Sequence, residues 1–186
     1  VRCYRYWPEL SSDCRLMTKL LRDLTDYSMS DQLTKQRSDL CNLLRRAYLS
    51  CLPLTEGTNK TLTYTSRVSC AYMPLDSPKM MEALLNLIVN ALDAVSDNGS
   101  VQIILTKSNE QFVVSITDDG CGIAPKQLLT IFHPFTTTKP DGTGLGLPVA
   151  KRIIEGHGGH IRVISAPNQG ATFTFLLPCS FSSDRK

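Results

Sequence analysis

The sequence predicts a mixed α/β sandwich, and three observations lead to this class. Stretches with helical spacing and stretches with strand alternation both occur, without the strict strand–helix alternation that builds a doubly wound parallel sheet. The chain has 186 residues, enough for one sizeable domain or for a domain plus a helical appendage. Hydrophobic residues make up 42% and charged residues 20% of it, as in an ordinary globular protein.

The N-terminal part is expected to be helical but separate from the globular domain. Residues 10–28 place apolar side chains at helical spacing, which is typical of an amphipathic helix. The polar residues 29–38 look like a linker. We therefore assign residues 1–36 to an N-terminal helix and linker, residues 37–180 to the globular domain and residues 181–186 to a C-terminal tail.

The globular domain is expected to begin with a helix and a strand. Residues 39–52 have helical spacing and stop before a proline. Residues 60–68 alternate like a strand. Ser77 and Pro78 suit the cap and first turn of a long helix over 79–95, which the DNGS stretch ends.

The second half of the domain is expected to consist mainly of strands. The runs 101–107 and 111–117 alternate around a short polar turn and predict a hairpin. A short helix, a loop rich in proline, threonine and glycine, a further helix and two closing strands follow, at 126–132, 133–142, 147–157, 160–166 and 171–178.

Charge and cysteine content exclude several classes of protein. The net charge is only +3 and no Lys/Arg run occurs, so nucleic acid is not an expected partner. No apolar run reaches about 18 residues, and the first residues lack the apolar core of a signal peptide. The seven cysteines include no CxxC pair or Cys/His cluster. Reduced thiols in a cytoplasmic domain fit this better than a zinc site or a disulfide framework.

The long predicted helix has two different faces. A helical projection puts one set of apolar side chains toward the core: Met81, Leu84, Leu85, Ile88, Leu92 and Val95. The opposite stripe is polar and contains Glu82, Asn86, Asn90 and Asp93. Asparagine and aspartate are poor helix formers because their side chains compete for backbone hydrogen bonds. The stripe therefore indicates a ligand, although plain solvation or packing against loops would also explain it.

Asp118, Gly120 and Gly122 form a DxGxG motif directly after an apolar strand. A carboxylate at a strand end can accept a hydrogen bond from an amino group such as the exocyclic amine of adenine, whereas the O6 of guanine would repel it. The glycines allow the backbone to approach the ring closely. A simple turn after a strand is the commoner explanation of such a motif.

Gly142, Gly144 and Gly146 immediately precede the helix predicted over 147–157. A helix N-terminus offers free N–H groups, and glycines let such groups converge on phosphate oxygens. The spacing matches neither the dinucleotide fingerprint nor the GxxxxGK[ST] phosphate loop. A phosphate cradle of another kind and a tight loop-to-helix junction both remain open.

Taken together and in order, four motifs resemble the N, G1, F and G2 boxes of sensor histidine kinases: NLIVNALDA at 86–94, DDGCGI at 118–123, IFHPFTTTK at 131–139 and GTGLGL at 142–147. These kinases belong to the GHKL ATPase superfamily. The stretch QGATFTFLLP also resembles the closing strand of that family, and the likeness is nearest to kinases of the nitrogen-regulation type. It covers residues 39–178 approximately.

The resemblance implies a fold and an activity. The fold is the Bergerat two-layer sandwich, in which a mixed, mostly antiparallel sheet carries helices on one face. The activity is that of an ATP-dependent protein-histidine kinase of a two-component system, a transferase in signal transduction and phosphorelay. The implied cofactors are ATP and Mg²⁺.

The resemblance also implies roles for individual residues. Asn86 and Asn90 would be catalytic, with Asn90 binding Mg²⁺ through its amide oxygen, and Asp118 would hold the adenine amine. Gly120 and Gly122 would line the base pocket, and Gly142, Gly144 and Gly146 would face the phosphates. Further implied nucleotide contacts are Asp93, Ile123, Thr143, Leu145, Leu147 and Thr172.

Residues 132–142 would form a mobile lid, according to the same resemblance. Phe132 and Phe135 would anchor it, and Lys139 would lie near the phosphates. A plain core role for both phenylalanines and a solvated role for Lys139 remain open.

Asn86 separates branches of the superfamily. DNA gyrase and MutL carry a glutamate there that activates water, whereas an amide cannot accept a proton from water. This favours phosphoryl transfer over ATP hydrolysis, with Glu82 one turn earlier as a substitute base to consider. A GHKL ATPase and a nucleotide-dependent interaction module are the alternatives.

The phosphoacceptor histidine of such kinases is missing from this sequence. The histidines are His133, His157 and His160, all within or after the nucleotide motifs, and we expect all three to be structural. The expected partners are therefore a histidine-bearing dimerisation domain and a response regulator, with a homodimer through the helix at 10–28 as a further expectation. Membrane association of a full-length protein stays open.

Overall fold

Five strands form one mixed sheet in the computed structural model, in the order β2-β4-β5-β7-β6. The structure describes residues 33–139 and 142–179. β2 pairs in parallel with β4, and the other three pairs are antiparallel, as predicted. The strands are Thr61–Ser66 (β2), Ser100–Ser108 (β4), Gln111–Asp118 (β5), His160–Ser165 (β6) and Ala171–Pro178 (β7).

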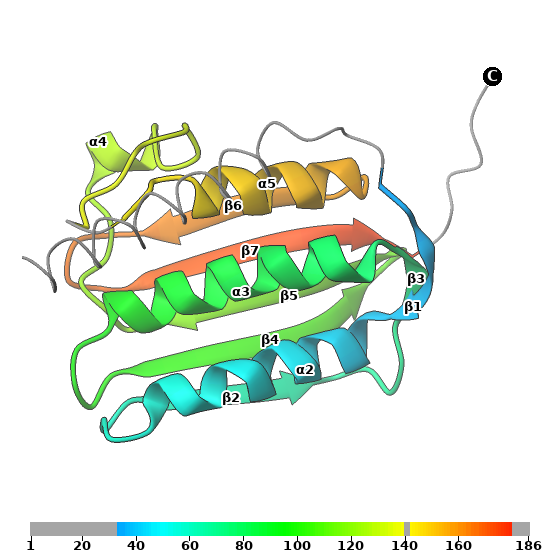
Figure 1. The fold of residues 1–186 in the computed structure, drawn as a ribbon, viewed down its shortest axis with the longest axis horizontal. Coiled ribbons are helices and arrows are strands. Elements are labelled where there is room, and N and C mark those ends of the chain that lie inside the picture. The colour runs from blue at the N-terminus through cyan, green and yellow to red at the C-terminus, as the bar shows by residue number, and fades with distance from the viewer. Residues whose placement is uncertain (1–32, 140–141, 180–186) are drawn as a thin grey trace, which may run out of the picture.

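Three helices cover one face of this sheet and form the second layer of the sandwich (Figure 1). They are α2 (Leu40–Cys51), α3 (Ser77–Ala94) and α5 (Gly146–Gly156). α3 lies between the other two and packs against both of them. The two-layer architecture with helices on one face is therefore confirmed, whereas the helix predicted at 10–28 and the tail at 181–186 lie outside the described residues.

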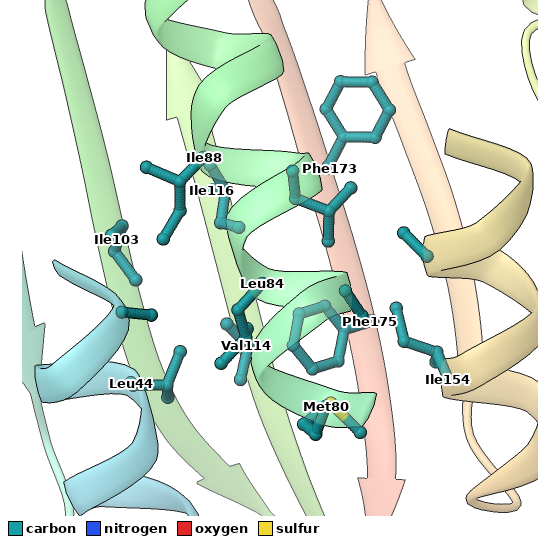
Figure 2. Packing of buried hydrophobic residues seen from close by; sticks show 14 of the residues in the cluster. Leu44, Met80, Leu84, Ile88, Ile103, Val114, Ile116, Ile154, Phe173 and Phe175 are labelled. Atoms are coloured by element: carbon teal, nitrogen blue, oxygen red, sulfur yellow. The ribbon is translucent and has the colours of Figure 1, made fainter. Parts of the chain in front are cut away.

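Hydrophobic side chains from both layers meet in a single core (Figure 2). Ile103, Ile116 and Phe175 of the sheet are fully buried, as are Leu84 of α3 and Ile154 of α5. Each such side chain contributes about 1.5–3 kcal/mol by leaving water. Within the described ranges, no helix combines the length and the apolarity that crossing a bilayer requires.

The buried face of α3 is broader than the helical projection of the sequence predicted, and it is centred on different residues. It consists of Met80, Ala83, Leu84, Leu87, Ile88, Ala91 and Leu92. Met81 and Leu85, predicted to be core, are only half-buried. The cause is that α3 buries its two flanks against α2 and α5 as well as its underside against the sheet. The helix is capped by Asp76, which accepts from the backbone N–H of Lys79 at 3.1 Å, rather than by Ser77.

Two short elements differ from the sequence-based expectation. β1 (Gln36–Asp39) pairs antiparallel with β3 (Tyr72–Leu75) in a small separate sheet. The linker assignment is therefore wrong for residues 36–38, and β3 was not predicted. Each of these strands pairs with a partner distant in sequence, and β1 lacks the alternating apolar pattern from which a strand is predicted.

The remaining short helices are the 3₁₀-helix η2 (Leu52–Thr55) and α4 (Pro125–Leu128). α4 is shorter than the predicted 126–132 because the chain turns after Leu128 through hydrogen bonds of the Thr130 and Ile131 N–H groups to the Gln127 carbonyl.

Candidate nucleotide-binding site

Three predicted site residues lie on the C-terminal half of α3, and one of them contacts the start of α5. Asn86, Asn90 and Asp93 are three or four residues apart on α3, so they lie on one side of that helix. Gly146 opens α5 directly beside Asn86, because a Cβ built on this glycine would lie 3.4 Å from the Asn86 Oδ1. The first residue of the asparagine stripe, Asn86, therefore lies against the first residue of α5.

Asp118 is the last residue of β5 and is buried, with only 4% of its surface exposed. Its Oδ1 accepts the backbone N–H groups of Gly120 at 3.0 Å and Ala171 at 3.2 Å. Burial raises the pKa of the Asp118 carboxyl, and the two N–H donors partly offset this rise. Among the described residues none donates to Oδ2, which remains available as an acceptor.

The loop after β5 packs tightly against the end of α3. The N–H of Cys121 donates to the Ala94 carbonyl at 3.1 Å. A Cβ on Gly120 would collide with that same carbonyl group. Only a glycine fits here, because the loop backbone runs directly over the helix end.

A turn at 166–170 supports this loop from the other side. The Gly170 N–H donates to the Gly120 carbonyl at 3.0 Å, and the Asn168 N–H donates to the Cys121 carbonyl at 2.7 Å. Gly122 has a φ of +68° and packs against the carbonyl of Ala166. Sequence reasoning missed this turn as part of the site, although the glycine at position 170, just before the last strand, was an available signal.

The neighbouring carboxylate, Asp119, has a different function from Asp118. It accepts the backbone N–H of Ser100 at 2.8 Å and the Ser100 hydroxyl at 2.7 Å. These hydrogen bonds lower the pKa of Asp119. Asp119 therefore ties the loop to the start of β4.

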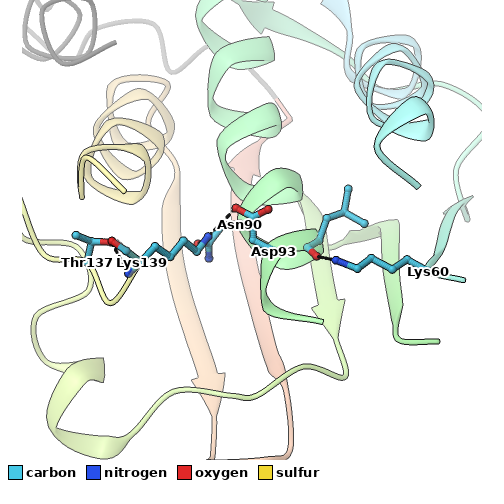
Figure 3. Close-up of polar contacts among 6 residues, drawn as sticks. Lys60, Asn90, Asp93, Thr137 and Lys139 are labelled. Carbon is cyan, nitrogen blue, oxygen red and sulfur yellow. Dashed lines mark hydrogen bonds and ion pairs between the residues drawn. The ribbon is translucent and has the colours of Figure 1, made fainter. Parts of the chain in front are cut away.

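Lys139 brings a positive charge to the polar stripe of α3 (Figure 3). Its Nζ donates to the Asn90 Oδ1 at 3.1 Å and to the Asp93 Oδ2 at 2.9 Å. The Asn90 amide oxygen is thus turned toward a cation, and an amide oxygen beside a carboxylate is a donor set that also suits Mg²⁺. The described ranges contain no cluster of three His, Cys, Asp or Glu side chains that could hold a metal alone.

Two of the three glycines at the start of α5 are required by packing against the loop at 135–139. Gly144 has a φ of +67°, and a Cβ there would lie 2.5 Å from the Phe135 carbonyl carbon. A Cβ on Gly142 would collide with Thr137. A tight junction therefore explains these two positions, whereas Gly146 faces Asn86 and has room for a Cβ.

The remaining loop positions predicted to contact the nucleotide are held in different ways. The Leu145 N–H donates to the Thr143 Oγ1 at 3.4 Å, and Leu145 itself is buried. Ile123 and Leu147 are half-buried against the core.

The side chain of Thr172 shares a hydrogen bond with Thr117 at 3.2 Å. This bond lies on the face of the sheet opposite to Asp118, because side chains alternate along a strand. The structure therefore does not bring the Thr172 side chain to the same face as Asp118 and the other predicted nucleotide contacts.

The two lid phenylalanines behave differently. Phe132 packs edge-on against Phe173 of the core, with ring centroids 6.5 Å apart. Phe135 is 62% exposed and has a φ of +64°. Phe132 thus packs against the core, as both the anchor and the plain core role would require. Phe135 does not, because the turn that bonds its N–H to the Gly144 carbonyl points its ring outward.

His157 is structural, as predicted. Its Nε2 accepts the Asp76 N–H at 2.9 Å, and its Nδ1 lies 2.7 Å from the Ile153 carbonyl. This joins the end of α5 to the start of α3. His133 and His160 are exposed.

The fold and the site together define a nucleotide-binding domain, and comparison with known proteins names its family. Residues 75–180 match the histidine kinase-, DNA gyrase B- and HSP90-like ATPase family. The chain belongs to this family.

Its relatives are sensor histidine kinases. ZraS from Salmonella typhimurium is 32% identical over 170 residues, which are 91% of this chain and 37% of that protein. AtoS from Escherichia coli is 36% identical over 165 residues, 87% of this chain and 27% of that protein. The catalytic domain of the histidine kinase ThkA has a similar structure, with a TM-score of 0.72 and 29% identity, covering 78% of this chain and 96% of that one. The chain thus spans about a third of the length of these curated relatives.

Proposed function

We propose that this domain binds Mg–ATP and transfers the γ-phosphoryl group to a histidine on a separate helical hairpin. The observation that carries the proposal is the meeting of Asn86, Asn90 and Lys139 with the start of α5. Amide oxygens, a cation and helix N–H groups are available there, and Asp118 at the end of β5 is buried and retains an acceptor. Each of these groups complements one part of a nucleotide.

Asp118 is proposed to recognise the adenine ring. Its Oδ1 is already engaged by two backbone N–H groups, which fixes the carboxylate and directs Oδ2 toward a donor. The exocyclic amine of adenine can donate to this oxygen, whereas the O6 of guanine would meet it with a like partial charge. Gly120, Gly122 and Ile123 would line the base beside it.

The phosphates are proposed to lie at the start of α5. The glycine-rich turn leaves backbone N–H groups at a helix N-terminus, where the helix dipole favours anions. Gly142, Thr143, Gly144, Leu145, Gly146 and Leu147 belong to this segment. Lys139 supplies the nearby positive side chain.

Asn90 is proposed to hold Mg²⁺ through the amide oxygen that now accepts from Lys139. A bound Mg²⁺ would neutralise charge on the transferring phosphoryl group. Asp93 would remain in the shell around it, and Asn86 would orient the phosphate region one turn earlier. A histidine nitrogen of the hairpin would then attack the γ-phosphorus in line, the bond to the bridging oxygen would break, and ADP would leave.

Transfer rather than hydrolysis is supported by the residue type at position 86 of α3. Asn86 is an amide and accepts no proton from water. Glu82, the substitute base to consider, forms an ion pair with Lys79 at 3.0 Å. We therefore expect ADP release to depend on an acceptor histidine, and we propose that a response-regulator aspartate receives the group next.

Calorimetry with nucleotides tests the binding step. The chain should bind ADP and ATP in the presence of Mg²⁺, and GDP and GTP far more weakly. Equal affinity for ADP and GDP would show that Asp118 does not select the base, and absence of any binding would remove the proposal.

A further inference from the structure

Lys139 and the Asn90 amide oxygen form a contact that the binding of a metal would have to break. Nζ of Lys139 lies 3.1 Å from the Asn90 Oδ1 and 2.9 Å from the Asp93 Oδ2 (Figure 3). Asn90 and Asp93 are three residues apart on α3, so one ammonium group reaches both. A cation therefore already occupies the oxygen proposed above as a Mg²⁺ ligand.

The backbone around Lys139 points its side chain back to α3. Its N–H donates to the Thr137 Oγ1 at 3.0 Å, and its carbonyl accepts from the Thr137 hydroxyl at 3.4 Å and from the Gly142 N–H at 3.2 Å. Gly142 packs so closely here that a Cβ would collide with Thr137. The contact is thus built into the shape of the loop rather than being a chance meeting of long side chains.

The two cations exclude each other at this oxygen. Mg²⁺ requires its oxygen ligands at about 2.0–2.1 Å in near-octahedral geometry, and a second positive charge hydrogen-bonded to the same amide would oppose it. The side chains of Lys139 and Asp93 are 40% and 51% exposed, so water screens their attraction and the contact is weak. It can therefore yield to a metal–nucleotide complex.

We propose that Lys139 is a tethered cation that occupies Asn90 until metal-bound nucleotide replaces it, with Asp93 as the residue that positions the lysine. On replacement the ammonium moves from Asn90 to the phosphates, so the same side chain couples the lid to α3 before binding and to the nucleotide afterwards. This inference rests on the proposed function, because it assumes that the metal–nucleotide complex binds at Asn90.

The side-chain amide signals of Asn90 in NMR spectra test the exchange. They can be assigned from their absence in Asn90→Asp. Lys139→Gln should shift these signals in the free protein, and the difference from wild type should disappear in the Mg–ADP complex. Lys151→Gln is the matched control, because Lys151 is also 40% exposed and pairs with Glu155 on α5, and it should leave the signals unchanged.

Three results would overturn the inference, and they differ from one another. Unchanged Asn90 signals in free Lys139→Gln would show that the contact does not exist. A difference that persists in the Mg–ADP complex would show that Lys139 never leaves. If Mg–ADP shifts the Asn90 signals in neither protein, the proposed location of the nucleotide site is wrong, and the proposed exchange is then wrong as well.

Discussion

Asp118 and Asp119 are adjacent aspartates with opposite environments, and this contrast gives a matched pair of variants. In Asp118→Asn, the amide NH₂ would face the adenine amine while the oxygen keeps the two backbone donors. The lost charged hydrogen bond costs about 1.5–3 kcal/mol, so ADP affinity should fall about 10- to 150-fold. Asp119→Asn should leave ADP affinity nearly unchanged, because Asp119 bonds only to Ser100 among the described side chains. Equal losses in both variants by calorimetry would remove Asp118 from base recognition.

The raised pKa of Asp118 predicts two opposite pH effects. Adenine requires the ionised carboxylate, so ADP affinity should fall as the pH drops through the raised pKa. Burial of the charge disfavours the folded state, so the Asp118 contribution to the unfolding free energy should rise over the same pH range as the group becomes neutral. Comparing wild type with Asp118→Asn in both calorimetry and urea unfolding isolates these effects, and parallel pH profiles for the two proteins would contradict the assignment.

At the level of elements, the glycines at the junction between the lid and α5 differ in function: Gly144 is required for packing, and Gly146 is proposed to leave room for the phosphates. Gly144→Ala should cost about 2–4 kcal/mol of unfolding free energy, because it combines a positive φ with a backbone collision. Gly146→Ala should change stability by less than about 1 kcal/mol, yet weaken ATP binding, because its methyl group enters the space beside Asn86. Urea unfolding and calorimetry on both variants test this. If Gly146→Ala folds and binds ATP with wild-type affinity, the glycine-rich turn is only a tight loop-to-helix junction and not a phosphate-binding site.

His157 joins α5 to the start of α3 only in its neutral form. Burial lowers its pKa, and its contacts use a proton on Nδ1 and a lone pair on Nε2, with Lys35 and Asp76 as the nearby charges. Its contribution to stability is therefore complete above the ordinary histidine pKa and is lost as the pH falls through that value toward the lowered one. His157→Gln should lose about 1–3 kcal/mol near neutral pH and show less dependence on acid, as measured by urea unfolding.

The exposed His160 provides the control for that measurement. His160→Gln should keep both the stability and the pH dependence of the wild type. A wild-type profile in His157→Gln would show that another group causes the acid sensitivity.

Sequence reasoning predicted the main strands and helices because their hydrophobic periods are strong and local. Asn86, Asn90 and Asp118 could be proposed as site residues because their residue types are unusual for a helix interior or a buried strand end. The β1–β3 pair could not be found, since its stability comes from pairing between segments 36–39 and 72–75. The outward ring of Phe135 also depends on a turn whose partner, Gly144, lies nine residues later.

The contact between Lys139 and α3 depends on tertiary structure in the same way. The sequence places a lysine in the lid but does not give its distance from Asn90. Similarly, the spacing of Gly142 and Gly144 predicts a ligand as readily as a packing requirement. The structure distinguishes these by showing what a Cβ would meet at each position.

At the scale of the whole molecule, the layout agrees with the proposal that the acceptor histidine lies on a separate hairpin. α5 has 11 residues and is therefore about 16 Å long, and its N-terminus is the proposed phosphate site. His157 and His160 follow its other end, too far for an in-line attack, which requires about 3–3.5 Å. His133 is exposed on the lid, within the segment proposed to cover the nucleotide.

Phosphoryl transfer from radiolabelled ATP tests the central claim most directly. The chain alone should acquire no acid-labile label, whereas a separate hairpin domain that carries a phosphoacceptor histidine should become labelled when the chain is added. Asn90→Ala should abolish this transfer, while Asp119→Asn should preserve it. Acid-labile label on the isolated chain would contradict the account and make His133 the first acceptor to test. Steady ATP hydrolysis without labelling of any hairpin would indicate a hydrolase instead.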